Sequence, residues 1–171
     1  MRGGIRVWVS VVAADSAGVA RNGAEVKIDE SAVIWSAPDR DRSDRPLLVL
    51  LHGYGSHEGD LFQLSPRLPL KPVIASVRAP IPESGGWAWF SLAERAVGAP
   101  TTADADAAAR AVLGWLDTLS YTTVSLLGFS QGAVTALQAL RLAPARFSSI
   151  VALSGFVATG DAVGDEDLAS R

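Results

Sequence analysis

The chain has 171 residues and contains no cysteine. This absence excludes disulfide bonds, a thiolate nucleophile and a cysteine-ligated metal site, and it is compatible with the reducing cytoplasm in which we expect the protein to be located. Long apolar runs are lacking too. The apolar stretch near the N-terminus is interrupted by Arg6 and is too short to cross a bilayer, as is every later run. We therefore expect no stable membrane anchor.

An excess of charge of one sign is also absent. The 15 Lys and Arg residues and 18 Asp and Glu residues give a net charge of -3 and are scattered along the chain. Without a basic patch, we expect no nucleic-acid partner. The glycines at 53–55 lack the third glycine of a phosphate-binding loop, and His57 and Glu58 lack a second histidine at helical spacing. We expect no metal and no cofactor, and we interpret His57 and Glu58 as the solvated start of a helix.

The length suits one domain, because 171 residues of which 49% are apolar can bury a sizeable core but are short for two domains. We assign the domain to residues 26–171 and treat residues 1–25 as an N-terminal extension. In the extension, isoleucine and valine recur at every second position from 5 to 11. The extension is therefore either an irregular leader or an extra edge strand.

Strands and helices are predicted to alternate along the domain. Apolar runs predict strands at residues 26–35, 47–51, 73–77, 123–127 and 147–153. Helical periodicity and terminal signals predict helices at residues 60–68, 101–119 and 131–143. Residues 157–171 are acidic and loop-like. This alternation predicts an α/β fold with a mostly parallel sheet and helices on both faces.

A G-x-S-x-G pattern at residues 128–132 lies between a predicted buried strand and a predicted helix. A sharp turn at that point would strain the backbone of Ser130 and bring Gly128 and Gly132 too close to their neighbours for a Cβ. The helix that begins at Gln131 would direct free N–H groups at the same point. The context favours a nucleophilic serine beside an anion site over a serine that only caps the helix.

Two further stretches are candidates for the same site. Gly53 and Gly55 follow the predicted strand at 47–51 and allow a tight turn over the carboxyl edge of the sheet, where open α/β sheets bind their ligands. Residues 85–90 gather three large aromatic side chains. These aromatics either cover the core or form the wall of an apolar substrate pocket.

Four motifs in order and spacing carry a resemblance to a known family, at residues 50–55, 89–90, 128–132 and 153–156. On these motifs the chain resembles the phospholipase/carboxylesterase family of α/β-hydrolases, which includes acyl-protein thioesterases. The similarity runs from about residue 33 to residue 156. It implies an α/β-hydrolase fold and a serine hydrolase that cleaves a small-molecule carboxylic ester or thioester.

Carried over residue by residue, the resemblance implies that Ser130 is the nucleophile and that the backbone N–H groups of Tyr54 and Gln131 form the oxyanion hole. Both amides would lie at the carboxyl ends of neighbouring strands, where they can stabilise developing negative charge. The elbow and oxyanion-loop glycines are Gly53, Gly55, Gly128 and Gly132. We expect the substrate pocket to be lined by Tyr54, Trp87, Trp89, Phe90 and Phe129.

The sequence departs from this family where the triad should be completed. In the family the acid and the base follow the nucleophile, whereas the histidines of this chain, His52 and His57, both precede Ser130. A serine without an adjacent base is a poor nucleophile. Three explanations stay open: the chain is a shortened form of a longer hydrolase, one of the two histidines acts as base from the other side, or the protein is a hydrolase-like binding module without catalysis.

A sheet that lacks its last strands would leave residues 150–153 as an exposed edge. This run is apolar at every position, which suits a strand that is covered on both faces and paired on both sides. Exposed apolar edges pair with other chains. We therefore expect self-association through this edge.

Overall fold

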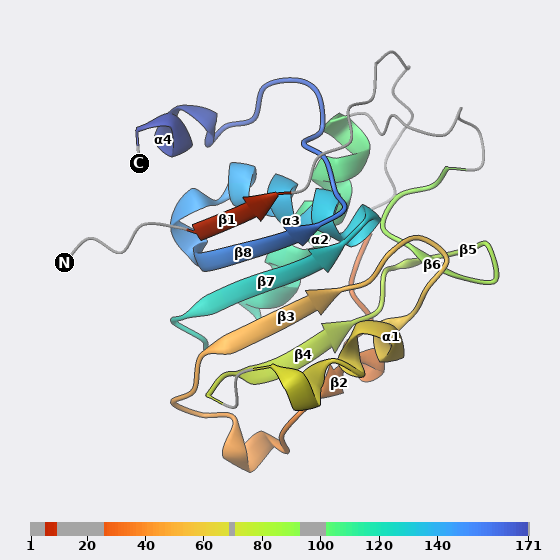
Figure 1. The fold of residues 1–171 in the computed structure, drawn as a ribbon, viewed down its shortest axis with the longest axis vertical. Coiled ribbons are helices and arrows are strands. Elements are labelled where there is room, and N and C mark those ends of the chain that lie inside the picture. The colour runs from red at the N-terminus through yellow and green to blue at the C-terminus, as the bar shows by residue number, and fades with distance from the viewer. Residues whose placement is uncertain (1–5, 10–25, 69–70, 93–101, 171) are drawn as a thin grey trace.

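A computed structural model of the chain describes residues 6–9, 26–68, 71–92 and 102–170, and in the first of these ranges only the backbone. Its centre is a six-stranded sheet in the order β1-β8-β7-β3-β4-β2 (Figure 1). The strands are β1 Arg6–Val9, β2 Ile34–Trp35, β3 Leu47–Leu51, β4 Val73–Val77, β7 Val124–Phe129 and β8 Phe147–Leu153. Neighbours pair in parallel except β2 and β4, which are antiparallel. The prediction of a mostly parallel sheet is confirmed.

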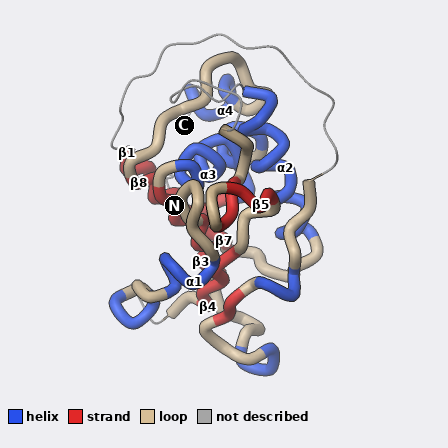
Figure 2. The backbone as a smooth tube through the Cα atoms, turned by 90° about the vertical axis from the view of Figure 1, so that its right-hand side faces the viewer, coloured by secondary structure: helices blue, strands red, loops and turns tan. Residues whose placement is uncertain are grey.

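Helices cover both faces of this sheet, but unequally. The helices α2, Thr102–Asp117, and α3, Gln131–Leu142, lie together on one face, and the short α1, Glu58–Phe62, lies on the other (Figure 2). A separate hairpin is formed by β5 Ile81–Glu83 and β6 Gly86–Ala88. The helix α4 is Asp165–Ala169, and single 3-10 turns lie at Glu30–Ala32, Asp39–Asp41, Ser65–Arg67 and Pro144–Arg146.

The larger core lies between the sheet and the layer of α2 and α3. Register places matching apolar side chains of β3 and β7 on this face, Leu47 beside Val124 and Val49 beside Leu126. All four are at most 1% exposed, and burying each contributes about 1.5–3 kcal/mol. A smaller cluster around Leu50 packs beneath α1 on the opposite face. These two cores fix the strands whose carboxyl ends carry the candidate site.

Strand β1 occupies the sheet edge that we expected to be open. It pairs in parallel with β8, from Arg6 opposite Ser149 to Val9 opposite Ala152. The expectation of an exposed edge at residues 150–153 is therefore wrong, because β1 supplies hydrogen-bond partners on that side. Residues 6–9 belong to the sheet, as the edge-strand alternative predicts, and the other residues of the 1–25 extension lie outside the described residues.

Two predicted elements differ in the structure. Residues 26–35 form a strand only at their end, because Asp29 accepts hydrogen bonds from the amide and hydroxyl of Ser31 at 3.0 and 2.6 Å and caps a 3-10 turn. Such local side-chain bonds compete with a strand ladder. The predicted helix at 60–68 divides into α1 and a 3-10 turn that contains Pro66, which has no N–H to continue a helix.

The acidic C-terminal residues, which we expected to be loop-like, fold against α3 and form α4. Arg141 of α3 binds Asp165 through Nε to Oδ1 at 2.7 Å and Nη2 to Oδ2 at 2.6 Å. Its Nη1 donates to the carbonyl of Ala158 and to Oε1 of Gln138 at 2.9 and 3.0 Å. Hydrogen bonding from Arg141 holds the pKa of Asp165 down at about 2. One arginine thus anchors this segment to the domain.

Deleting residues 1–9 should make the chain self-associate. The deletion removes β1 and exposes the backbone edge of β8, which is then free to pair with another copy. A matched deletion of residues 1–5 keeps β1 and serves as the control. Size-exclusion chromatography with light scattering measures the mass of both chains at equal concentration, and the same mass for both would contradict the role of β1.

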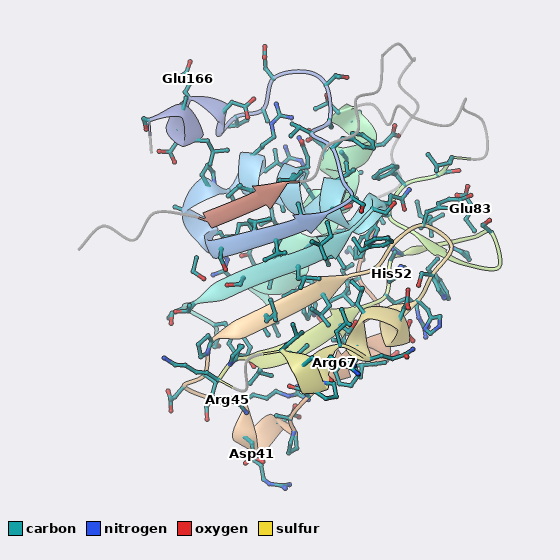
Figure 3. All side chains as sticks on the ribbon, in the orientation of Figure 1. Asp41, Arg45, His52, Arg67, Glu83 and Glu166 are labelled. Atoms are coloured by element: carbon teal, nitrogen blue, oxygen red, sulfur yellow. The ribbon has the colours of Figure 1, made fainter. Side chains whose placement is uncertain are left out.

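Replacing Asp165 by asparagine should lower stability at neutral pH and have little effect in acid. Because the folded pKa is about 2 against an ordinary 3.8, ionised Asp165 stabilises the fold above about pH 4, and this contribution is lost as the pH falls through 2. Urea denaturation at a series of pH values measures the difference. Glu166→Gln, in the same helix but exposed, is the control (Figure 3). A difference between wild type and Asp165→Asn that does not change with pH would contradict the pairing.

Candidate active site

Ser130 lies at the turn between β7 and α3, at the carboxyl end of the sheet. Its backbone has φ 52° and ψ −116°, a conformation that residues with a side chain rarely adopt and that costs on the order of 1–3 kcal/mol. The surroundings hold it there. Its amide donates to the carbonyl of Leu153 at the end of β8 (2.8 Å), and its carbonyl accepts the amides of Ala133 and Val134.

The hydroxyl of Ser130 makes no capping hydrogen bond to α3. The alternative that this serine only caps the helix is therefore excluded. The residue is partly exposed. The first amides of α3 have no partners within the helix, and all helix amides point toward its N-terminal end, which is the turn at Ser130. A free hydroxyl thus lies beside the positive end of a helix dipole.

Close backbone packing accounts for the glycines on either side of Ser130. A Cβ on Gly128 would lie 2.3 Å from the carbonyl oxygen of Gly132, and a Cβ on Gly132 would lie 2.1 Å from that of Leu51. Neither distance is tolerable, so both positions need glycine. The first turn of α3 consequently rests on the carboxyl end of β3, next to the loop that follows it.

That loop passes beside Ser130. A Cβ on Gly53 would lie 3.6 Å from the Cβ of Ser130. Two backbone hydrogen bonds join the loop to β6, from the Gly55 amide to the Trp87 carbonyl at 3.0 Å and from the Trp87 amide to the Ser56 carbonyl at 2.9 Å. Gly55 has φ 70°, which turns the loop so that both bonds can form. The hairpin of β5 and β6 therefore fixes the position of the loop.

The backbone amides of Tyr54 and Gln131 are the expected oxyanion donors. Gln131 is the first residue of α3, where an N–H has no partner within the helix. In the described part of the chain, neither amide donates to a backbone carbonyl. Gln131 adjoins Ser130 in sequence, and Tyr54 follows Gly53, which lies against Ser130. Their action on an oxyanion stays a prediction.

The aromatic residues expected in the pocket fall into two groups. Trp89 and Phe90 are 1% and 4% exposed and belong to the main core. This placement matches the alternative in which they cover the core, and the Trp89 indole donates to the carbonyl of His52 at 2.8 Å. Phe129 is 43% exposed and Trp87 is half-buried. Phe129 and Trp87 therefore keep apolar surface that solvent reaches, and a substrate pocket at these residues stays a prediction.

His52 follows β3 and is fully buried beside this core. Its Nδ1 bonds the carbonyl of Gly53 at 2.7 Å, and its Nε2 accepts the amide of Ala79 at 3.0 Å. Burial lowers the pKa of the ring, and the two bonds need the neutral form with its proton on Nδ1. Both nitrogens are committed, so His52 holds the loop and does not serve as a base. Figure 3 shows it at the carboxyl end of the sheet.

His57 has a structural partner as well, because its Nδ1 accepts the amide of Gly59 at 3.1 Å and caps α1. Glu58 is not solvated, contrary to expectation. Its side chain is 12% exposed and forms a bidentate ion pair with Arg78, which lowers the pKa of Glu58. The Arg78 guanidinium lies over the ring of Trp87, 4.8 Å from its centroid. The ion pair therefore holds the Arg78 guanidinium over Trp87.

Tyr54 is held by Glu83 at the end of β5. The tyrosine hydroxyl donates to Oε1 of Glu83 at 2.9 Å, which raises the pKa of Tyr54, and the Leu92 amide donates to the same oxygen at 3.0 Å. Ser84 and Gly85 follow with φ 58° and 77°, as in a type I′ hairpin turn. Sequence patterns did not indicate Glu83 or Arg78 as site residues. The signal available in the sequence was their position, because Arg78 directly follows β4 and Glu83 directly precedes a Ser-Gly-Gly turn.

The geometry agrees with a comparison to protein families, in which residues 32–168 match the phospholipase/carboxylesterase family. The chain belongs to this family. The order and direction of its strands are those of an α/β-hydrolase fold, as the resemblance implied.

Solved structures share the fold of this phospholipase/carboxylesterase family member. A carboxylesterase from Mesorhizobium loti superposes with a TM-score of 0.63 at 19% identity, over 82% of this chain and 69% of that one. A carboxylesterase from Bacillus cereus gives 0.56 at 22% identity, over 70% and 57%. An uncharacterized hydrolase from Mycosarcoma maydis is 27% identical in an alignment of 116 residues that covers 60% of this chain. The chain spans 44% of that curated relative.

Within residues 6–9, 26–68, 71–92 and 102–170, no group of three or more His, Cys, Asp or Glu residues could hold a metal ion. In the same ranges, none of the helices is long and apolar enough to span a bilayer.

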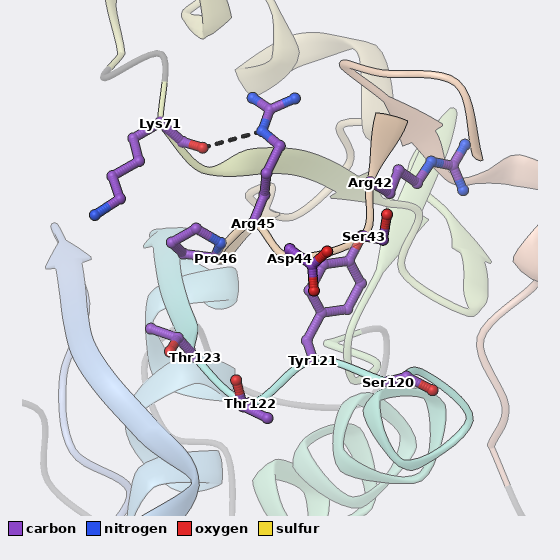
Figure 4. A pocket seen from close by; sticks show the side chains of 10 residues that line it. All are labelled: Arg42, Ser43, Asp44, Arg45, Pro46, Lys71, Ser120, Tyr121, Thr122 and Thr123. Carbon is purple, nitrogen blue, oxygen red and sulfur yellow. Dashed lines mark hydrogen bonds between the residues drawn. The ribbon is translucent and has the colours of Figure 1, made fainter. Parts of the chain in front are cut away.

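A hollow of about 730 Å³ lies near the amino ends of β3 and β7, at the other end of the sheet from Ser130 (Figure 4). Its lining is about equally polar and apolar and comes mainly from two loops, residues 42–46 and 120–123, with Lys71. Arg45 lies across it and donates to the carbonyls of Lys71 and Pro72, both at 3.1 Å. In this family member, Arg45 therefore ties the loop at 42–46 to the backbone just before β4.

Gly132→Ala should destabilise the domain by more than about 3 kcal/mol or prevent it from folding, because the added methyl collides with backbone that cannot move. The control is Gly114→Ala on the exposed side of α2, where an added Cβ has nothing within 4 Å. That change should stabilise the helix by about 0.5–1 kcal/mol. Urea denaturation and soluble yield measure both, and a mild effect of Gly132→Ala would refute the close contact.

Proposed function

We propose that this chain carries the nucleophile and the oxyanion hole of a serine hydrolase that cleaves carboxylic esters or thioesters. The observation that carries the proposal is the geometry of Ser130 between β7 and α3, beside the loop of Tyr54. Its backbone is strained, and its hydroxyl makes no capping hydrogen bond to the helix. Membership of the phospholipase/carboxylesterase family supports it, as does a fold shared with two carboxylesterases.

In the proposed reaction, the Ser130 hydroxyl attacks the carbonyl carbon of a small-molecule ester while a base takes its proton. The amides of Tyr54 and Gln131 hold the negative charge that develops on the carbonyl oxygen, and each contributes about 3 kcal/mol in the transition state. Collapse of the tetrahedral intermediate releases the alcohol or thiol and leaves an acyl group on Ser130, which water then hydrolyses. Phe129 and Trp87 offer apolar surface to the acyl part.

The base of this reaction is the part that the chain does not supply. No histidine follows Ser130 in the 171 residues, and His52 and His57 are bonded to backbone groups. We propose that the acid and the base come from sequence outside these 171 residues, in keeping with the greater length of the relatives.

A second candidate is a hydrolase-like module that binds an apolar ester without cleaving it. The structural engagement of both histidines favours it. So does an exposed apolar surface next to Ser130, where Phe129 and Leu153 are partners in register at the ends of β7 and β8 and are 43% and 40% exposed. The two candidates differ in whether Ser130 reacts.

A fluorophosphonate probe should label Ser130 of the 171-residue chain slowly. Without an adjacent base, the labelling rate should rise steadily with pH and lack the inflection near about pH 6.5 that a histidine base produces. Mass spectrometry of the labelled peptide and a pH series measure the site and the rate. Ser130→Ala should abolish the labelling.

Ser154→Ala is the matched control. Ser154 also follows a strand of the sheet and has a positive φ of 54°, but it has no helix start beside it, and its replacement should leave labelling unchanged. No labelling at any pH would favour the binding module. Labelling that persists in Ser130→Ala would overturn the assignment of the nucleophile.

A further inference from the structure

The side chain of Gln131 has no part in the proposed reaction, which uses only the backbone amide of this residue. It is nevertheless 5% exposed and is hydrogen-bonded through both of its polar atoms. Its Oε1 accepts the amide of Trp89 at 2.7 Å, and its Nε2 donates to the carbonyl of Phe90 at 2.6 Å. These partners fix which way the carboxamide points, because a backbone amide only donates and a carbonyl only accepts.

Trp89 extends this connection to the loop after β3. Its indole Nε1 donates to the carbonyl of His52 at 2.8 Å, and the two rings lie with their centroids 5.7 Å apart. The ring of His52 in turn bonds the carbonyl of Gly53. Buried hydrogen bonds therefore run from the start of α3, through Trp89, to the residue two positions before Tyr54.

We propose that the Gln131 carboxamide is a positioning group that sets the separation of the two oxyanion amides, those of Tyr54 and Gln131. Strand pairing aligns β3 and β7 as far as Leu51 and Gly128, and both amides lie beyond that point. The path through Gln131, Trp89 and His52 spans this remaining gap. Its catalytic meaning rests on the proposed function, in which a misplacement of about 1 Å can cost about a hundredfold in rate.

The test compares Gln131→Met with Gln138→Met. Gln138 is the matched control because it lies in the same helix, is 1% exposed and donates from Nε2 to Oδ1 of Asp106 at 2.6 Å. Both changes remove a buried carboxamide, so both should lower stability. Only Gln131→Met should shift the NMR resonance of the Tyr54 amide and speed hydrogen exchange of the Trp89 amide by about tenfold or more.

The same variants are then labelled with the fluorophosphonate probe. Gln131→Met should lower the rate at Ser130 by about tenfold or more, and Gln138→Met should leave it unchanged. Gln131→Glu, which keeps the acceptor for Trp89, should keep the slow exchange of the Trp89 amide. Should Gln131→Met fail to fold, Trp89→Phe replaces it, because this change removes the indole donor to the His52 carbonyl and breaks the same path, with a shift of Tyr54 as the deciding readout.

The NMR measurements need no reaction at Ser130. A Tyr54 shift specific to Gln131→Met supports the positioning role even where the wild type fails to label, which would count against the proposed function alone. An unchanged Tyr54 resonance or an equal shift in both glutamine variants would overturn it. Where the wild type labels, an equal labelling rate of Gln131→Met would overturn it as well.

Discussion

The contact between Gly132 and the carbonyl of Leu51 governs the geometry on which the site depends. Since no Cβ intervenes, the first turn of α3 lies directly on the carboxyl end of β3, and the loop after β3 is brought against Ser130. The chain must then turn from β7 into α3 at a single residue, which accounts for the strained backbone of Ser130. The conformation persists because parallel pairing of β7 with β3 and β8 holds the strand on both sides.

Around this contact, polar side chains are bonded mainly to backbone and seldom to one another. His52 joins the carbonyl of Gly53 to the amide of Ala79, and Gln131 joins the amide of Trp89 to the carbonyl of Phe90. Each satisfies buried groups that would otherwise cost about 1–3 kcal/mol. Such side chains act as fixed cross-links between loops, and the hydroxyl of Ser130 makes no capping bond to α3.

Those parts of the structure that follow from local chemistry could be predicted from the sequence. Strands β3, β4 and β8 coincide with the predicted runs because a buried parallel strand is apolar along its length. The sharp turn at Ser130 could be predicted because the glycines on either side of it leave room for close backbone packing. The pairing of β1 with β8 joins residues far apart in sequence, which no local pattern encodes. Nor can composition say whether an aromatic residue such as Trp89 faces the core or a ligand, since both surroundings are apolar.

The placement of charge completes the account of the site. A carboxylate at position 131 would hold a negative charge beside the point where the proposed oxyanion forms, and in a water-poor site such a charge would raise the barrier to attack. A glutamine supplies the same acceptor without the charge, and adds a donor. Two carboxylates are paired with arginines, Glu58 with Arg78, whose guanidinium lies over Trp87, and Asp165 with Arg141 of α3. In the proposed reaction, neutral cross-links beside Ser130 thus leave the helix dipole and the backbone amides to act on the bound carbonyl.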